Sequence, residues 1–166
     1  DIQGKLAEQM HEKENLFSAA ATMIRGAEIL QIPVLATEQI PEKIGATVPQ
    51  IAERLNTEPI PKKTFSCCAN RTFMDALNHS ARSQVLIAGI ETHICVSQTA
   101  EHLLAKGYGV EVLADAVSSR SRQNRKIGLE KIRTCGGRVT CVESALFELL
   151  GTADASEFRD ILKIVK

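Results

Sequence analysis

The sequence predicts a three-layer α/β fold of the doubly wound, Rossmann-like type, in which a mainly parallel sheet carries helices on both faces. Short apolar runs rich in β-branched residues alternate with longer amphipathic segments, an order typical of parallel strands joined by right-handed helical crossovers. No internal repeat or low-complexity segment interrupts this order. With 166 residues the chain has the length of one well-buried domain, so residues 1–166 are predicted to form a single domain.

The first element of this fold is expected to precede the sequence itself. The chain opens on Asp1-Ile2-Gln3, yet functional side chains in such folds follow the carboxyl ends of strands, and the first strand is usually central. We therefore expect an apolar strand of about five to six residues before Asp1 in the natural protein.

The remaining elements follow from apolar spacing and from residues that begin or end regular structure. Helices are predicted where apolar side chains recur on one helical face, and strands where short β-branched runs are bounded by polar residues or prolines. The predicted helices cover residues 15–30, 49–55, 71–78, 92–106, 122–134, 144 onward and 156–165. The predicted strands cover residues 32–36, 59–63, 85–90, 110–114 and 138–142.

The stretch 83–107 carries the strongest chemical signal. Val85–Ile90 predicts a strand buried on both faces, and the helical pattern after it ends at Gly107, a residue suited to a helix C-terminus. Cys95 then falls in the first turn of a helix, where free N–H groups and the helix dipole favour a thiolate and a lowered thiol pKa. The alternative is that Cys95 is a small core residue, as most free cysteines are.

Two distant side chains are expected to meet Cys95. Ligands bind at the carboxyl ends of the strands in an open parallel sheet, and Asp1, Lys62 and Cys95 each fall at or just after such an end. Asp1 would accept the thiol proton, and Lys62 would hold positive charge beside the developing thiolate.

The segment that contains Cys95, GIETHICVSQTAEHL, resembles the nucleophile segment of the isochorismatase-like cysteine hydrolases. This superfamily also holds nicotinamidases and N-carbamoyl-amino-acid amidohydrolases. The stretches DIQ, KKTFS and LADAVSSRS match in the same order. Together with TEQIPEKIGATVPQI they are most similar to the branch called isochorismatase domain-containing proteins, and the resemblance covers essentially the whole chain.

The resemblance implies the isochorismatase-like hydrolase fold and a catalytic triad of Asp1, Lys62 and Cys95. It also implies an oxyanion hole made by the backbone N–H groups of Glu91 and Cys95, with a cis peptide between Ile90 and Glu91. Members of the family commonly form homo-oligomers, so a homo-oligomer is expected.

Two adjacent lysines compete for the catalytic position. Lys62 precedes Phe65 by three residues and Ser66 by four, which is the spacing of the family's Lys-x-x-aromatic-Ser/Gly pattern, whereas Lys63 is one residue off. Neighbours in an extended chain face opposite ways, so only one of them can point inward. We choose Lys62 and expect Lys63 to be a solvated surface lysine.

Three residues are candidates for the substrate pocket. Gln39 and Phe65 follow strand ends near the triad, and Thr92 lies at the turn before Cys95. The alternatives for the first two are a solvated loop amide and a core aromatic. The run Ser118–Ser121 either borders the pocket or caps the helix that follows it.

Neither a metal nor a cofactor is expected. Nicotinamidases carry an Asp and two His ligands in the loop after the second strand, but the corresponding TEQIPEKIG has no histidine, which puts nicotinamide in doubt as a substrate. The four histidines are scattered, with one of them two residues from Cys95; they are His11, His79, His93 and His102. The sequence also lacks the glycine-rich motifs that bind dinucleotides or nucleoside triphosphates.

Charge and composition narrow the partners. Twenty basic residues balance twenty acidic ones, so no long-range field favours nucleic acid or an anionic membrane, and a small-molecule substrate is the expected partner. No apolar run approaches the roughly 20 residues that span a bilayer, and nothing resembles a signal peptide. Five cysteines without a paired pattern fit a reducing compartment, so a cytoplasmic location is expected.

These features predict a metal-independent hydrolase that cleaves a C–N bond of the amide type in a small molecule, through a thioester on Cys95. Isochorismate itself is a less suitable substrate, because its vinyl ether can be cleaved by acid catalysis without a thiol. Two alternatives stay open: a catalytically silent binding or scaffold protein of the same fold, and a redox-sensing thiol.

Overall fold

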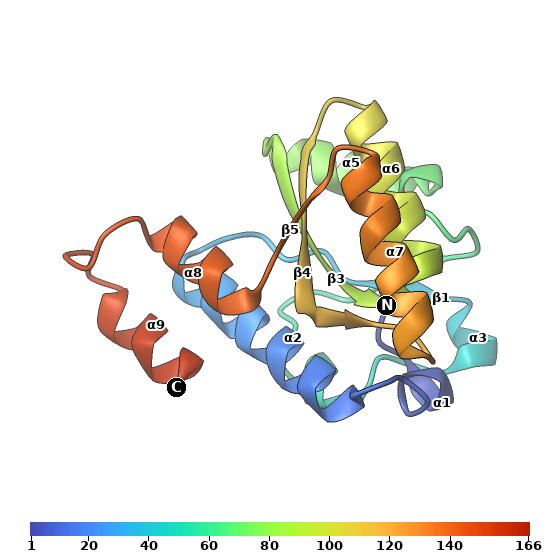
Figure 1. The fold of residues 1–166 in the computed structure, drawn as a ribbon, viewed down its shortest axis with the longest axis horizontal. Coiled ribbons are helices and arrows are strands. Elements are labelled where there is room, and N and C mark those ends of the chain that lie inside the picture. The colour runs from blue at the N-terminus through green and yellow to red at the C-terminus, as the bar shows by residue number, and fades with distance from the viewer.

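A computed structural model describes all residues from 1 to 166, and in it helices alternate with parallel strands (Figure 1). The strands form two ladders. In the first, β1 (Thr37–Gln39) pairs in parallel with β2 (Ile60–Lys62). The second contains β3 (Gln84–Ile90), β4 (Gly109–Ser118) and β5 (Arg138–Thr140), parallel and in that order. The predicted α/β class is thus confirmed, with ladder hydrogen bonds that divide the strands into two groups.

Helices connect and cover these strands. They are α1 (Gly4–Ala7), α2 (Lys13–Ile29), α3 (Pro41–Ile44), α4 (Pro49–Ala52), α5 (Arg71–His79), α6 (Ser97–Ala105), α7 (Arg122–Thr134), α8 (Val142–Leu150) and α9 (Phe158–Val165). Two short turns of other helical types are the 3-10 turn η1 (Cys67–Ala69) and the π-helical turn η2 (Thr92–Val96). None of the helices combines the length and the apolar character needed to cross a membrane.

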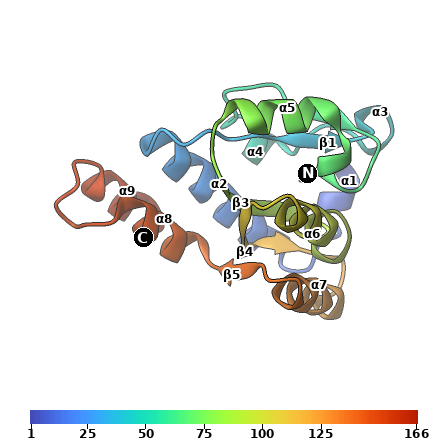
Figure 2. The same cartoon turned by 90° about the horizontal axis from the view of Figure 1, so that it is seen from above.

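The core lies on both faces of the β3–β5 ladder, as two neighbours in β4 illustrate. Successive side chains of a strand point to opposite faces. Leu113 packs in the cluster that holds the apolar faces of α2 and α8, whereas Val112 packs with those of α5, α6 and α7. Figure 2 shows the same arrangement, with α2 on one side of β3 and β4 and with α6 and α7 on the other. The helices therefore form layers on both faces, as predicted.

The strand predicted over residues 32–36 is wrong in position. Pro33 has no N–H to donate to a ladder. Pairing starts only at the end of the segment, where the Ile60 N–H donates to the Ala36 carbonyl at 2.8 Å, and β1 follows directly.

Other boundaries move because of contacts that are distant in sequence. β4 continues to Ser118, past the predicted end at residue 114, after a register shift opposite Ile87 and Gly89. α8 begins two residues before the predicted start, because the Asp115 carboxylate accepts the Val142 N–H at 3.0 Å. α9 begins at residue 158 instead of 156, and the predicted helix 92–106 begins as a π-helical turn before α6.

Asp1 lies beside the carboxyl end of β3, where Figures 1 and 2 mark the N-terminus. The Ile90 N–H donates to the Asp1 carbonyl at 2.9 Å. Gly89 permits this approach, because its φ is +118° and a Cβ there would lie 3.0 Å from the Asp1 carbonyl oxygen. The strand expected before Asp1 stays a prediction.

Candidate active site

A buried ion pair stands at the centre of the site. Lys62, the last residue of β2, places its Nζ 2.7 Å from Asp1 Oδ2, and the two side chains are 0% and 6% exposed. Charged side chains are rarely buried to this extent unless they are paired, because each loses its hydration. Two residues 61 positions apart in the sequence are therefore held together without solvent between them.

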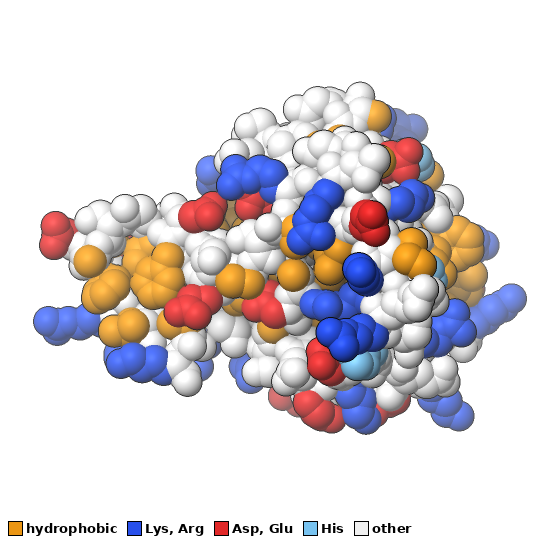
Figure 3. Space-filling view, in the orientation of Figure 1, with side chains coloured by type: hydrophobic (Ala, Val, Ile, Leu, Met, Phe, Trp, Pro, Cys, Tyr) orange, Lys and Arg blue, Asp and Glu red, His pale blue; other side chains and the backbone are white.

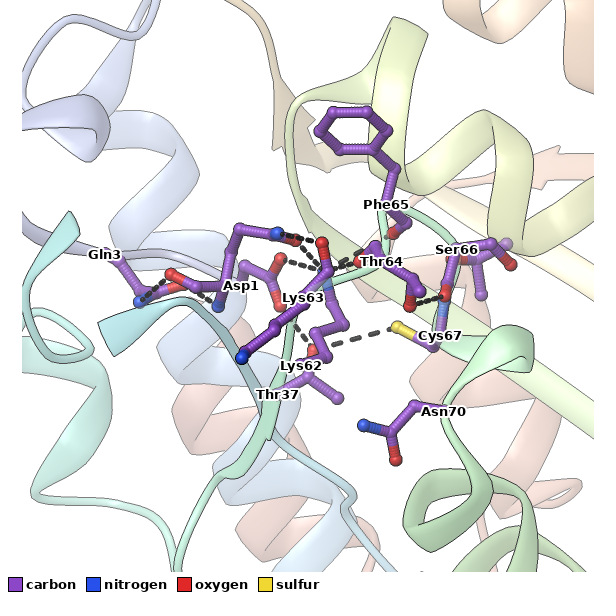
Figure 4. Close-up of polar contacts among 12 residues, drawn as sticks. Asp1, Gln3, Thr37, Lys62, Lys63, Thr64, Phe65, Ser66, Cys67 and Asn70 are labelled. Atoms are coloured by element: carbon purple, nitrogen blue, oxygen red, sulfur yellow. Dashed lines mark hydrogen bonds and ion pairs between the residues drawn. The ribbon is translucent and has the colours of Figure 1, made fainter. Parts of the chain in front are cut away.

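Lys62 uses its remaining donors on nearby oxygens, as Figure 4 shows in part. Its Nζ donates to Gln39 Oε1 at 2.7 Å and lies 3.2 Å from the Thr64 carbonyl and 3.3 Å from the Phe65 carbonyl. Since an ammonium group has three donors and no acceptor, four oxygens around it leave no N–H unpaired. The ammonium group is thus fixed in place.

Gln39 is held as firmly as the lysine it contacts. Its side-chain Nε2 donates to the Lys63 carbonyl at 2.8 Å, and its backbone N–H donates to Gln3 Oε1 at 2.6 Å. Gln3 in turn donates to the Gly45 carbonyl at 2.7 Å. The pocket candidate Gln39 therefore supports Lys62 directly, and it is buried instead of being a solvated loop amide.

The sequence analysis missed two side chains of this network. Thr37 Oγ1 donates to Asp1 Oδ1, and Gln3 joins the β1 strand to the residues after Asp1. Cys67 also approaches, with its Sγ 3.7 Å from Thr37 Oγ1 (Figure 4). Alternate residues of a strand share one face, so a pocket role for Gln39 was a signal that Thr37 faces the same site.

The structure places the two lysines on opposite sides of the chain, since Lys62 is buried and Lys63 is exposed. Phe65 contributes its carbonyl to Lys62, but the residue is 56% exposed and its ring points away from the ion pair (Figure 4). Lys62, and not Lys63, thus pairs with Asp1.

Cys95 lies in the π-helical turn η2, which follows β3 through a cis peptide between Ile90 and Glu91. Thr92, the first residue of the turn, is fully buried and its hydroxyl has no hydrogen-bond partner. Helix α7 packs directly on it: a Cβ at Gly128 would lie 2.6 Å from the Thr92 carbonyl carbon. π-helical turns occur often at functional sites.

The pKa of the Cys95 thiol is raised, and burial is the main cause. The positive charge of Lys62 and a hydrogen bond from the Glu91 backbone act in the opposite direction, but they do not outweigh burial. The expectation of a lowered pKa is therefore wrong. A helix N-terminus favours a thiolate only where the sulfur keeps enough solvation, and this sulfur is partly buried.

The histidines do not gather around the site. His93 Nδ1 lies 3.0 Å from Ser119 Oγ, and His102 Nδ1 lies 2.9 Å from Ser66 Oγ. No three His, Cys, Asp or Glu side chains come together in a way that could hold a metal ion. Both histidines thus act in hydrogen bonds between elements.

The chain is similar to known proteins over most of its length. Residues 1–144 match the family model of the isochorismatase domain. The secreted isochorismatase effector Isc1 of Phytophthora sojae is 41% identical over 150 residues, which are 87% of this chain and 71% of that protein. Isochorismatase domain-containing protein 2A of Mus musculus is 36% identical over 167 residues, covering 100% of this chain and 80% of that protein.

A solved structure is similar over nearly the same length. The structure of the MAR1 ribonuclease from Caenorhabditis elegans has 35% sequence identity and a TM-score of 0.94, and the match covers 99% of this chain and 85% of that one. The family model and these relatives agree, and the chain belongs to the isochorismatase domain family.

Proposed function

We propose that this chain is a cysteine hydrolase that cleaves a C–N bond of the amide type in a small molecule, with Cys95 as nucleophile and Asp1 and Lys62 as its partners. The observation that carries the proposal is the buried ion pair, with Lys62 Nζ 2.7 Å from Asp1 Oδ2 and with the lysine charge acting on the Cys95 thiol. A buried ion pair adds little to stability by itself. Membership of a hydrolase-type family supports a chemical role for it.

In the proposed first half of the cycle, the Cys95 sulfur attacks the carbonyl carbon while its proton passes to Asp1. A thiol with a raised pKa needs such a base, because it is protonated when the substrate arrives. The carbonyl oxygen becomes an oxyanion, which the backbone N–H groups of Glu91 and Cys95 would stabilise. The C–N bond then breaks, and the amine leaves with the proton from Asp1.

In the second half, water hydrolyses the thioester. Asp1 takes a proton from the water, the oxygen attacks the acyl carbon, and the Cys95 sulfur leaves and regains the proton. Lys62 stays charged throughout and balances the negative charge that forms beside it. The cycle includes no metal ion, because backbone N–H groups polarise the carbonyl.

A binding or scaffold protein of the same fold is the second candidate, and the raised pKa of Cys95 favours it. A thiol that stays protonated at neutral pH is a weak nucleophile unless a base assists it. In that case the Asp1–Lys62 pair would be a structural remnant, and Cys95 would form no thioester.

RNA is a further substrate to test, because the related Caenorhabditis elegans structure is described as a ribonuclease. Lys and Arg side chains gather over α7 on the face shown in Figure 3. The whole chain nevertheless has as many acidic as basic residues, so its net charge does not favour a polyanion.

The proposal is tested by incubating the wild type, Cys95→Ala and the control Cys135→Ala with a panel of small amides and N-carbamoyl compounds and with RNA. Cys135 is an exposed free cysteine outside the site. We expect Cys95→Ala to lower amide hydrolysis at least about a thousandfold, and Cys135→Ala to leave it unchanged.

Mass spectrometry of the quenched wild type should also show an acyl adduct on Cys95. Amide hydrolysis that survives Cys95→Ala would contradict the nucleophile. Cleavage of RNA alone would replace the substrate class, and binding without turnover of any compound would favour the second candidate.

A further inference from the structure

The segment after β4 contacts the Cys95 turn in a way that the proposed cycle does not use. The Arg120 backbone N–H donates to Glu91 Oε2 at 3.0 Å, and the Arg120 Nε lies 3.2 and 3.3 Å from the two Glu91 carboxylate oxygens. The Glu91 side chain is only 6% exposed, although that of Arg120 is 55% exposed. Because the acceptor is buried, this contact fixes the Glu91 residue and not only a surface charge.

A second contact from the same segment reaches the other side of the turn. His93 Nδ1 lies 3.0 Å from Ser119 Oγ, and Ser119 is fully buried. Glu91 and His93 stand on either side of Thr92, whose backbone lies against α7. The consecutive residues 119 and 120 therefore hold the start of η2 at two points.

Residues 118–121, which include Ser119 and Arg120, are themselves fixed by hydrogen bonds to other elements. The His11 N–H donates to the Ser119 carbonyl at 2.9 Å, and Ser118 Oγ donates to the His11 carbonyl at 2.6 Å. At the other end, Ser121 Oγ accepts the Asn124 N–H at 3.1 Å and caps α7. Of the two alternatives for this run, the helix cap is present at Ser121, and the segment is tied to the α1–α2 connection and to α7.

We infer that Arg120 and Ser119 are positioning residues for the proposed hydrolysis. They fix Glu91 and His93, so that the backbone N–H groups of Glu91 and Cys95 keep the direction in which an oxyanion would form. This inference rests on the proposed function. Both positioning residues follow β4, and neither forms a hydrogen bond with the Cys95 thiol or with the Asp1–Lys62 pair.

The chain offers a matched control for Arg120. Arg138 Nε lies 2.9 Å from Glu111 Oε1, and the two side chains are 72% and 18% exposed. This pair resembles the Arg120–Glu91 pair in type, but it joins β5 to β4 away from η2. Arg138→Ala therefore removes a similar ion pair without disturbing the turn.

The experiment compares Arg120→Ala with Arg138→Ala in amide hydrolysis, in alkylation of Cys95 by iodoacetamide, and in hydrogen exchange of the peptide 91–96. We expect Arg120→Ala to lower kcat about tenfold to a hundredfold with KM nearly unchanged, because misplaced donors act on the transition state. Alkylation should change much less than kcat, since it forms no oxyanion. Exchange in 91–96 should become faster, and Arg138→Ala should change none of these.

Two conservative variants keep the inference falsifiable if Arg120→Ala does not fold. Arg120→Lys keeps the positive charge and the backbone N–H, and Glu91→Gln keeps an oxygen that accepts a hydrogen bond. We therefore expect both variants to keep a larger part of the wild-type kcat than Arg120→Ala does. Ser119→Ala should cost several-fold less than Arg120→Ala.

Equal kcat in Arg120→Ala and Arg138→Ala would overturn the inference. If the wild type hydrolyses no amide, the proposed function fails, and hydrogen exchange alone decides the positioning role. Unchanged exchange of 91–96 in Arg120→Ala would then refute it.

Discussion

The two halves of the candidate site are built in opposite ways. On the β1–β2 side, buried polar side chains pair with one another: Asp1 with Lys62 and Thr37, and Lys62 with Gln39. On the β3 side, the Cys95 thiol is half-buried with a raised pKa. The β1–β2 side is a closed network of charges and side-chain hydrogen bonds. The β3 side is formed by the η2 turn.

The η2 turn is held in place by residues of other elements. Helix α7 packs on the backbone of Thr92 and His93, and Arg120 and Ser119 hold Glu91 and His93 through their side chains. The hydroxyl of Thr92 stays without a partner. The comparison teaches that the charged half is held by hydrogen bonds among its own side chains, whereas the thiol half is held by contacts from α7, Ser119 and Arg120.

Removing Lys62 should have the largest effect on this comparison. In Lys62→Met the buried Asp1 carboxylate loses its counter-charge, which we expect to lower the free energy of unfolding by about 3 to 5 kcal/mol. Urea denaturation measures the loss. Lys163→Ala is the control, because it removes only an exposed pair with Asp160 and should leave the midpoint unchanged. A wild-type midpoint for Lys62→Met would mean that the pair is not buried in solution.

The next largest effect is expected at Thr37, whose hydroxyl donates to Asp1 Oδ1. Thr37→Val keeps the shape but removes the donor, and losing a hydrogen bond to a charged group should cost about 1.5 to 3 kcal/mol. Thr37→Ser keeps the hydroxyl and should recover most of the loss in the same urea titration. An unchanged midpoint in Thr37→Val would contradict a contribution of this hydrogen bond to stability.

The η2 turn that carries Cys95 should be sensitive to changes in packing instead of changes in charge. In Gly128→Ala the new Cβ would lie 2.6 Å from the Thr92 carbonyl carbon and 2.7 Å from the His93 nitrogen, so α7 must move off the turn. We expect a loss of about 1 to 3 kcal/mol and an altered alkylation rate at Cys95.

Gly26→Ala is the matched control for this overpacking. Its Cβ would meet only the end of the Leu146 side chain, 2.2 Å from Cδ2, and that side chain can change rotamer. We expect a smaller loss of stability and an unchanged alkylation rate at Cys95. A change in alkylation by both glycine variants would show that the turn senses general destabilisation and not α7.

The smallest expected effect is a shift in the pH dependence of Cys95. Burial raises the pKa of this thiol, and only the thiolate reacts with iodoacetamide. The rate should therefore go on rising above the ordinary thiol pKa of about 8.5, where a short unfolded peptide levels off. Mass spectrometry of alkylated Cys95 measures the profile. A plateau below that pH would show that the helix-terminus argument holds after all.

The sequence by itself determined the features that depend on local patterns. Alternating apolar runs and helical stripes predicted the α/β class, and the segment around Cys95 predicted the family that the comparisons show. The choice between Lys62 and Lys63 also followed from local spacing, and the structure buries the first and exposes the second. Spacing is sufficient there because neighbours in an extended segment must face opposite ways.

Only the tertiary structure decided the features that depend on burial and on distant partners. Burial reverses the expected pKa shift of Cys95, and Gln39 supports Lys62 because Gln3 and β2 reach it from other parts of the chain. The contact from Arg120 to Glu91 spans 29 residues, which no local window contains. Desolvation and long-range hydrogen bonds arise only when distant segments pack together, so a local sequence pattern contains neither of them.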